Sequence, residues 1–211
     1  MGLSLALEAG ERLGLYAAEL EKWSRKMNLV GPAPLPEIID KHFLDSLTLL
    51  PLLAEQSLPD LLDVGTGAGF PGLVLKAVLP QLAVTLVEPR QKRAAFLRHI
   101  IRTLELREIA VVEARLRTDG TTPLPRPGGY HLVTARALSE IAPFLALIAP
   151  YCLPGGHAVC MKGSRWQEEL ESWQQTENGE FVLAESREWR LPFSGDYRCL
   201  LLFRKERAGW K

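Results

Sequence analysis

One stretch decides the fold of this chain: Leu61-Leu-Asp-Val-Gly-Thr-Gly-Ala-Gly-Phe-Pro-Gly72. The apolar residues at its start predict a short buried strand, and the alternate glycines Gly65, Gly67 and Gly69 predict a tight turn. Pro71 suits the first turn of a helix, because its missing N–H needs no partner there. Glycine has no Cβ and tolerates positive φ, so a ligand can lie against bare main chain at a helix N-terminus.

The sequence after this stretch alternates between strand and helix patterns. Strands are expected at 61–64, 83–87, 109–113, 132–134 and 158–162, and helices at 71–79, 91–104 and 140–149. Such alternation predicts an α/β fold with a doubly wound, Rossmann-like parallel sheet. Two last strands, at 181–191 and 198–203, are joined by a Pro-Phe-Ser-Gly-Asp turn and predict an antiparallel pair at the C-terminal end of the sheet.

The segment before residue 56 reads as a helical extension. Apolar residues at helical spacing indicate at least two amphipathic helices, separated by Gly31-Pro32-Ala33-Pro34. The sequence therefore predicts an N-terminal extension, residues 1–55, packed on a core domain, residues 56–211.

Composition is that of an ordinary globular protein, with 47% hydrophobic and 24% charged residues in 211. No apolar run approaches the ~18 residues of a membrane span, and the first residues lack the basic region and cleavage site of a signal peptide. A cytoplasmic location is expected. Cys152, Cys160 and Cys199 stand in apolar contexts without metal-ligand spacing, so buried thiols and no metal site are expected.

The glycine loop allows two ligands. Residues 67–72 satisfy the dinucleotide pattern G-x-G-x-x-G, and Glu88 stands about 20 residues further on to hold a ribose, as in NAD-binding proteins. Asp63 within the strand end, followed by glycines at 65, 67 and 69, resembles class I S-adenosylmethionine-dependent methyltransferases. The simpler alternatives are a loop-capping carboxylate for Asp63 and a solvated strand end for Glu88. The cofactor interpretation is favoured because open α/β sheets bind ligands at strand carboxyl ends.

Motifs along nearly the whole chain, from about Trp23 to Phe203, resemble one family, the bacterial small-subunit rRNA guanine-N7 methyltransferases, also called the glucose-inhibited division B family. They are Trp23-Ser-Arg-Lys-Met-Asn-Leu29, Lys41-His-Phe-Leu-Asp-Ser-Leu47, Asp63 to Gly72, Thr134-Ala-Arg-Ala137 and Lys162-Gly163. The resemblance implies methyl transfer from S-adenosylmethionine to N7 of a guanosine in 16S rRNA. The implied partner is 16S rRNA or the small ribosomal subunit. A monomer is expected.

The expected site residues follow from the loop and the resemblance. Expected to bind the cofactor are Asp63, Gly65, Gly67, Gly69, Phe70, Glu88, the backbone at Leu116 and Arg117, and Arg136; expected to contact RNA are His42, Arg98, Arg102, Arg136 and Lys162. Arg136 is also the candidate for positioning the guanine. N7 of guanine carries an unprotonated lone pair, so no catalytic acid or base is expected.

Each RNA-contacting candidate has a structural alternative. Arg136 could pair with Glu140 one helical turn on, His42 could be a packing residue, and Lys162 could be an ordinary surface lysine. Arg98 and Arg102 could belong to any solvated amphipathic helix. Two residues depart from the family pattern: Ala135 stands where serine is common, and Arg117 where an acid is common.

The overall charge argues against a nucleic-acid substrate, because 25 basic residues are balanced by 25 acidic ones. The region from Arg90 to Arg117 is nevertheless locally basic. A small-molecule methyltransferase, an NAD-dependent oxidoreductase and a non-catalytic interaction module therefore remain as alternatives. The first would have a closed pocket without a basic rim, and the second a hydride-transfer site.

Overall fold

A computed structural model describes residues 5–136, 139–176 and 179–206. Its seven-stranded sheet has the order β3-β2-β1-β4-β5-β7-β6. The strands are β1 (Asp60–Val64), β2 (Ala83–Val87), β3 (Ile109–Val112), β4 (Tyr130–Arg136), β5 (Cys152–Lys162), β6 (Phe181–Arg190) and β7 (Tyr197–Lys205). The first five are parallel, while β7 runs antiparallel to both β5 and β6. The predicted doubly wound sheet with a terminal antiparallel pair is confirmed.

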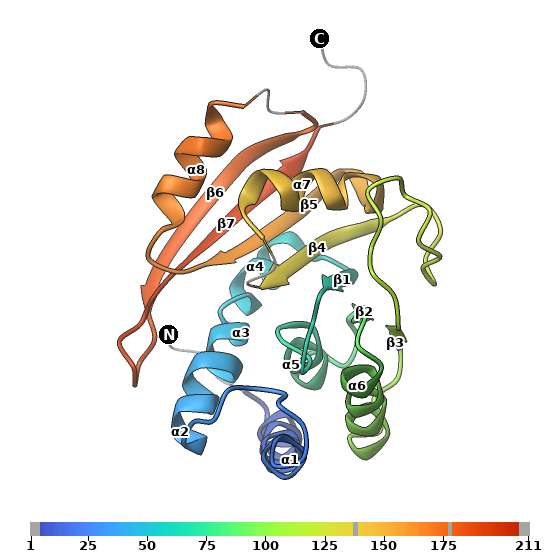
Figure 1. The fold of residues 1–211 in the computed structure, drawn as a ribbon, viewed down its shortest axis with the longest axis vertical. Helices are drawn as coiled ribbons and strands as arrows, with labels where there is room; N and C mark the ends of the chain where they lie inside the picture. The colour runs from blue at the N-terminus through green and yellow to red at the C-terminus, as the bar shows by residue number, and fades with distance from the viewer. Residues whose placement is uncertain (1–4, 137–138, 177–178, 207–211) are drawn as a thin grey trace.

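Helices cover both faces of the sheet (Figure 1). They are α1 (Leu7–Ser24), α2 (Leu35–Ile38), the π-helix η1 (Ile39–Leu44), α3 (Asp45–Leu47), α4 (Leu50–Gln56), α5 (Gly72–Val78), α6 (Gln91–Thr103), α7 (Ile141–Ile148), the 3₁₀ turn η2 (Ala149–Tyr151) and α8 (Trp166–Gln174). The N-terminal helices share one hydrophobic cluster with α5 and α6, and α7 and α8 belong to a second cluster. The chain between β3 and β4 contains no helix.

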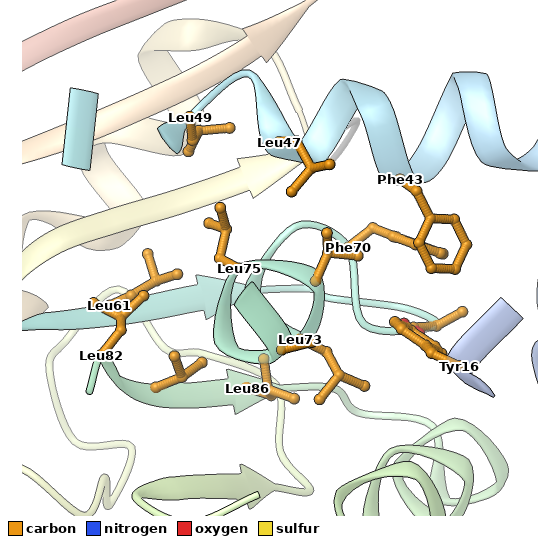
Figure 2. Close-up of a cluster of buried hydrophobic side chains, with 14 of the residues drawn as sticks. Tyr16, Phe43, Leu47, Leu49, Leu61, Phe70, Leu73, Leu75, Leu82 and Leu86 are labelled. Atoms are coloured by element: carbon orange, nitrogen blue, oxygen red, sulfur yellow. The ribbon is translucent and has the colours of Figure 1, made fainter. Parts of the chain in front are cut away.

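The first cluster joins the N-terminal helices to the sheet (Figure 2). Helix α5 is apolar nearly all round and is buried between β1, β2 and the N-terminal helices, as expected for a helix without a polar face. Tyr16 of α1 and Phe43 of η1 contact Phe70, in the loop just before α5. The N-terminal helices therefore pack against the segment that carries the glycine loop. The division at residue 55 into an extension and a core domain stays a prediction.

Two local expectations need correction, and one helix was missed. Helix α5 begins at Gly72, and Pro71 is its N-cap rather than its first residue. Strand β5 begins at Cys152 because the Pro154-Gly155-Gly156 segment continues the strand, with a shift in its pairing to β4, instead of turning. Helix α8 was not predicted; Trp166 and Trp173 are its buried residues, and Glu168 and Glu169 lie in its first turn.

All three cysteines are buried, as predicted. Burial raises the pKa of each thiol to about 12. Within the described ranges, no cluster of histidine, cysteine and carboxylate side chains could hold a metal ion. No helix in the same ranges is long and apolar enough to cross a membrane.

Candidate cofactor and substrate site

The candidate site lies where the sheet reverses its winding. Strand β1 pairs with β2 on one side and with β4 on the other. The strands β2 and β3 therefore extend the sheet in one direction from β1, and β4 and β5 extend it in the other. Ligands of open α/β sheets bind at such a switch point, beyond the strand carboxyl ends. Here the glycine loop follows β1, Glu88 follows β2 and Arg136 ends β4. The fold brings these predicted site residues to one sheet edge.

The glycine loop needs its glycines for two different reasons. Gly65, Gly67 and Gly69 have φ of 69°, 61° and 105°, which L side chains rarely adopt. A Cβ at Gly69 would lie 2.5 Å from the Tyr16 hydroxyl oxygen, whereas a Cβ at Gly67 would meet only an arginine side-chain tip, at 3.6 Å. Gly69 is therefore required by packing, and Gly67 leaves open main chain for a ligand.

Asp63 accepts hydrogen bonds from both ends of this loop. Its fully buried Oδ2 accepts hydrogen bonds from the Thr66 hydroxyl at 2.6 Å and from the Gly72 amide at 2.8 Å. Among the described residues its other oxygen, Oδ1, has no hydrogen-bond partner. Burial raises the pKa of Asp63 to about 6, and the bonds from Thr66 and Gly72 oppose that rise. The loop-capping alternative thus describes what the Asp63 carboxylate does in the folded chain.

Glu88 holds the middle of the loop. Its Oε2 accepts from the Gly67 amide at 3.0 Å, and its Oε1 accepts from the Arg90 amide at 2.9 Å. The side chain is buried, so the solvated strand end is ruled out. Each carboxylate oxygen has a second lone pair, which leaves acceptor capacity for ligand hydroxyls.

Tyr16 is a site-supporting residue that the sequence analysis did not identify. It is fully buried, and its hydroxyl donates to the carbonyl of Ala68 within the glycine loop. Its ring stacks on Phe70 at 5.7 Å between centroids, and burial raises its pKa well above 10. In sequence, Tyr16 is one more apolar position of an amphipathic helix, so only the tertiary structure reveals its contact with the loop.

Phe70 joins the loop to the other predicted residues. His42 stacks on its ring at 5.0 Å between centroids, and the Arg136 guanidinium carbon lies 5.1 Å from its centroid. The Arg136 side chain contacts His42 directly, with 2.6 Å between Nη2 and Nδ1, and donates to the Lys41 carbonyl at 2.8 Å. Burial, followed by the charge of Arg136, lowers the pKa of His42 to about 3. The packing alternative for His42 is therefore partly correct.

The ion-pair partner of Arg136 is Asp45, and the Glu140 alternative is wrong. Arg136 Nη1 lies 3.4 Å from Asp45 Oδ2, and Arg198 Nε of β7 lies 3.4 Å from Asp45 Oδ1. Burial raises the pKa of Asp45, and both arginines oppose that rise. Sequence proximity favoured Glu140, whereas the fold places Asp45 of α3 beside the end of β4, with Arg198 of β7 on its other carboxylate oxygen. Ala137, which follows in the same motif, lies outside the described residues.

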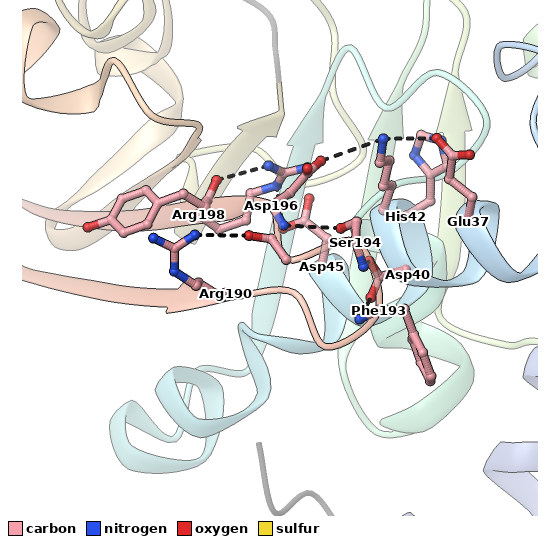
Figure 3. A network of polar contacts seen from close by, with 12 residues as sticks. Glu37, Asp40, His42, Asp45, Arg190, Phe193, Ser194, Asp196 and Arg198 are labelled. Atoms are coloured by element: carbon pink, nitrogen blue, oxygen red, sulfur yellow. Dashed lines mark hydrogen bonds and ion pairs between the residues drawn. The ribbon is translucent and has the colours of Figure 1, made fainter.

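The turn between β6 and β7 packs against η1, the π-helix that carries His42 (Figure 3). The fully buried Asp40 accepts from the amides of Phe193, at 3.3 Å, and Ser194, at 2.8 Å. Lys41 forms ion pairs with Glu37 at 2.9 Å and with Asp196 at 3.6 Å. The π-helix therefore places His42 against Phe70, while Asp40 and Lys41 of the same helix bind the β6–β7 turn.

The remaining predicted residues lie around this centre with partners of their own. Leu116 is buried in the second hydrophobic cluster. The Arg117 carbonyl accepts from the Tyr151 hydroxyl at 2.7 Å, and its exposed guanidinium pairs with Asp119. Asp119 thus holds the Arg117 guanidinium at the surface, while the Arg117 amide donates to the Thr122 hydroxyl.

Lys162, Arg98 and Arg102, the other candidates for RNA contact, are either paired or exposed. Lys162 pairs with Glu169 at 2.6 Å and donates to the Ser139 carbonyl. On α6, Arg98 pairs with Glu113 and Arg102 is exposed. A groove of about 760 Å³, lined by residues such as Leu53 and Val78, lies at the amino ends of the strands, away from this site.

The residues at the switch point fit S-adenosylmethionine. Open main chain at Gly67 and the carboxylates of Asp63 and Glu88 suit a ligand that carries an ammonium, a sulfonium and ribose hydroxyls. The fold and this site define a class I S-adenosylmethionine-dependent methyltransferase. A solved S-adenosylmethionine-dependent methyltransferase from Aquifex aeolicus shares the fold with a TM-score of 0.56 at 19% identity, over 80% of this chain and 93% of that one. An rRNA methylase from Streptococcus thermophilus shares it with a TM-score of 0.51 at 10% identity, over 71% and 88%.

The chain belongs to the rRNA small subunit methyltransferase G family, GidB, whose sequence profile matches residues 10–187. The ribosomal RNA small subunit methyltransferase G of Desulfotalea psychrophila is 44% identical over 97% of this chain and 93% of its own length. The protein of the same name from Myxococcus xanthus is 38% identical over 98% and 93%. The family resemblance predicted from the motifs is confirmed. The chain is therefore a methyltransferase, and the NAD-dependent oxidoreductase and the non-catalytic interaction module are ruled out.

Proposed function

We propose that this protein transfers the methyl group of S-adenosylmethionine to N7 of a guanosine in 16S rRNA. The observation that carries the proposal is one juxtaposition. The glycine loop, which Asp63 and Glu88 hold by hydrogen bonds, adjoins the Arg136–His42 pair, because both Arg136 and His42 lie against Phe70 of that loop. A cofactor-binding surface thus adjoins polar groups that suit a nucleotide substrate.

The cofactor site of this proposal comprises the loop and its supports. Asp63, Gly65, Gly67, Gly69, Phe70 and Glu88 form its centre, with the backbone at Leu116 and Arg117 flanking the adenine and Arg136 at its border. Bound S-adenosylmethionine supplies an electrophilic methyl group on sulfur. N7 supplies an unprotonated lone pair, so the residues of this chain need not remove a proton. Their task is to hold N7 in line with the methyl group, which contributes roughly 7–11 kcal/mol to lowering a barrier.

The proposed RNA contacts are His42 and Arg136 near the reacting base, with Lys162, Arg98 and Arg102 further out. The chain is proposed to act as a monomer in the cytoplasm, with free rRNA or the small subunit as its substrate. Light scattering of the purified protein at micromolar concentration measures the first of these points.

The test is methyl transfer followed by nucleoside analysis. Purified protein, labelled S-adenosylmethionine and either free 16S rRNA or small subunits lacking the modification are incubated, and the RNA is digested. Labelled 7-methylguanosine is expected, at a position mapped by chemical cleavage next to that nucleoside. The Gly67→Val variant, which places a branched side chain on the open loop, is expected to fold but bind S-adenosylhomocysteine at least about tenfold more weakly. Label in any other nucleoside, or none in RNA, contradicts the proposal.

A further inference from the structure

The tautomer of His42 is fixed by its neighbour. A guanidinium carries five N–H donors and no acceptor, so the 2.6 Å contact from Arg136 Nη2 requires Nδ1 of His42 to accept. A neutral imidazole that accepts at Nδ1 carries its proton on Nε2. Arg136 is itself held by the Lys41 carbonyl and Asp45, so it has no freedom to turn away.

The Nε2–H donor of His42 has no partner among the described residues, and the ring is partly exposed. The ring is fixed from one side by its stacking on Phe70, which belongs to the glycine loop. A rigid N–H donor therefore borders the proposed cofactor site.

We propose that His42 selects guanine by donating from Nε2–H to guanine O6, the acceptor next to N7. This inference rests on the proposed function and assigns the base specificity of the same site. Guanine presents two acceptors, N7 and O6, on this edge, whereas adenine presents the N7 acceptor and an amino donor. A fixed donor satisfies O6 but faces the adenine amino group donor to donor, and an unpaired polar group is costly. A histidine free to change tautomer could offer an acceptor and would tolerate adenine.

The charges around His42 keep it neutral. Arg136 of β4, Arg198 of β7 and Lys41 of η1 face the ring and disfavour its protonation, while Asp45 is shared by the two arginines. With burial, they hold the pKa of His42 near 3. The donor tautomer therefore persists throughout the neutral and mildly acidic range.

Nitrogen-15 NMR of the histidine side chains tests the tautomer without any substrate. In the wild-type protein the His42 ring is expected to remain neutral with the proton on Nε2 from pH 8 to pH 5. In Arg136→Met, which removes the donor to Nδ1, a second tautomer is expected to appear. A proton on Nδ1 in the wild type, or titration of His42 within that range, overturns the proposal.

Base specificity is tested with a double-substitution cycle. The mapped guanosine of the RNA is replaced by 2-aminopurine riboside, which keeps N7 and lacks O6. The matched protein variant is His42→Asn, whose amide oxygen can replace Nδ1 as the acceptor for Arg136 while nothing replaces Nε2. Each change alone is expected to lower kcat/KM by about tenfold or more, and the second change should add little to the first. Unchanged melting temperature and S-adenosylhomocysteine affinity exclude a folding effect of His42→Asn.

Two results overturn the proposal in different ways. Fully additive losses, or unchanged transfer by His42→Asn, show that His42 and O6 do not interact while the proposed reaction stands. Absence of transfer from the wild-type protein to the guanosine RNA removes the proposed function, and the specificity with it.

Discussion

Asp63 makes the stability of the protein depend on pH through a single buried carboxyl. Its pKa is about 6 in the folded state, above the ~3.9 of an unfolded aspartate. The folded chain therefore binds this proton more tightly than the unfolded chain does. The contribution of protonated Asp63 to the free energy of unfolding is complete below pH ~3.9 and is lost as the pH rises through 6. Asp63→Asn keeps an acceptor for Thr66 and Gly72 without the charge. Its stability relative to wild type is expected to increase between pH 4 and pH 7 by up to about 3 kcal/mol.

Urea denaturation at several pH values measures this difference. Because both proteins share every other titrating group, those contributions cancel. A stability difference that does not change with pH contradicts the assignment of the raised pKa to Asp63.

Glu88 is expected to serve three partners, the Gly67 and Arg90 amides and a ribose hydroxyl of the cofactor. Glu88→Ala removes a charged acceptor, so S-adenosylhomocysteine affinity should fall by roughly 1.5–3 kcal/mol, or about 10- to 150-fold. Isothermal calorimetry measures this loss. The control is Glu113→Ala, which removes the exposed acid after the next strand and should leave affinity unchanged. Equal effects of the two variants contradict a specific role for Glu88.

At the scale of elements, α1 supports the glycine loop through one hydrogen bond. Tyr16→Phe leaves the aromatic packing on Phe70 intact but leaves the buried Ala68 carbonyl unpaired, at a cost of about 1–3 kcal/mol. Tyr130→Phe is the matched control, because its hydroxyl bonds Thr85 at the far end of the strands. Both variants are expected to lose stability in urea denaturation, and only Tyr16→Phe to weaken S-adenosylhomocysteine. Equal binding by both shows that α1 does not influence the loop.

The β6–β7 hairpin depends on Asp40 in the same way. Asp40→Ala removes the acceptor for the Phe193 and Ser194 amides, so hydrogen exchange in residues 191–196 should accelerate while the strands remain protected. Asp196→Ala, which removes a half-exposed partner of Lys41 and Arg198, should change exchange much less. Exchange unchanged by Asp40→Ala indicates that the turn is held by its own backbone bonds.

The elements that sequence could predict are those with strong local patterns. Strand β2 was predicted at its observed bounds, since a buried strand ends where Glu88 begins the turn. Helix α8 has only two buried residues, Trp166 and Trp173, and was missed, while the apolar spacing that predicts a helix at η1 does not reveal its π form. The contacts of the site follow the same division. The position of the glycine loop could be read from spacing, whereas the partners of Arg136 come from η1 and α3, more than 90 residues away in sequence.

At the scale of the whole molecule, a net charge of zero means that any attraction for RNA is local. Exchanging Arg98 and Arg102 of α6 for glutamine should lower the slope of log affinity against log salt by up to about 2, near 0.9 per phosphate contact. Affinity for S-adenosylhomocysteine should stay the same. The control exchanges Arg190 and Arg204, exposed on β6 and β7, and should keep the wild-type slope. Equal slopes for the two double variants remove α6 from the RNA-binding face.

Asp45 balances one arginine from β4 and another from β7, so its environment is complete only when the last strand of the sheet is in place. A nascent chain in which β7 has not yet been synthesised has the carboxylate and only part of its compensating charge. The hairpin that closes over Asp40 is missing at that stage as well. Asp45 thus acquires both of its compensating arginines only after β7 has been made, when the glycine loop and its acids are already in the chain.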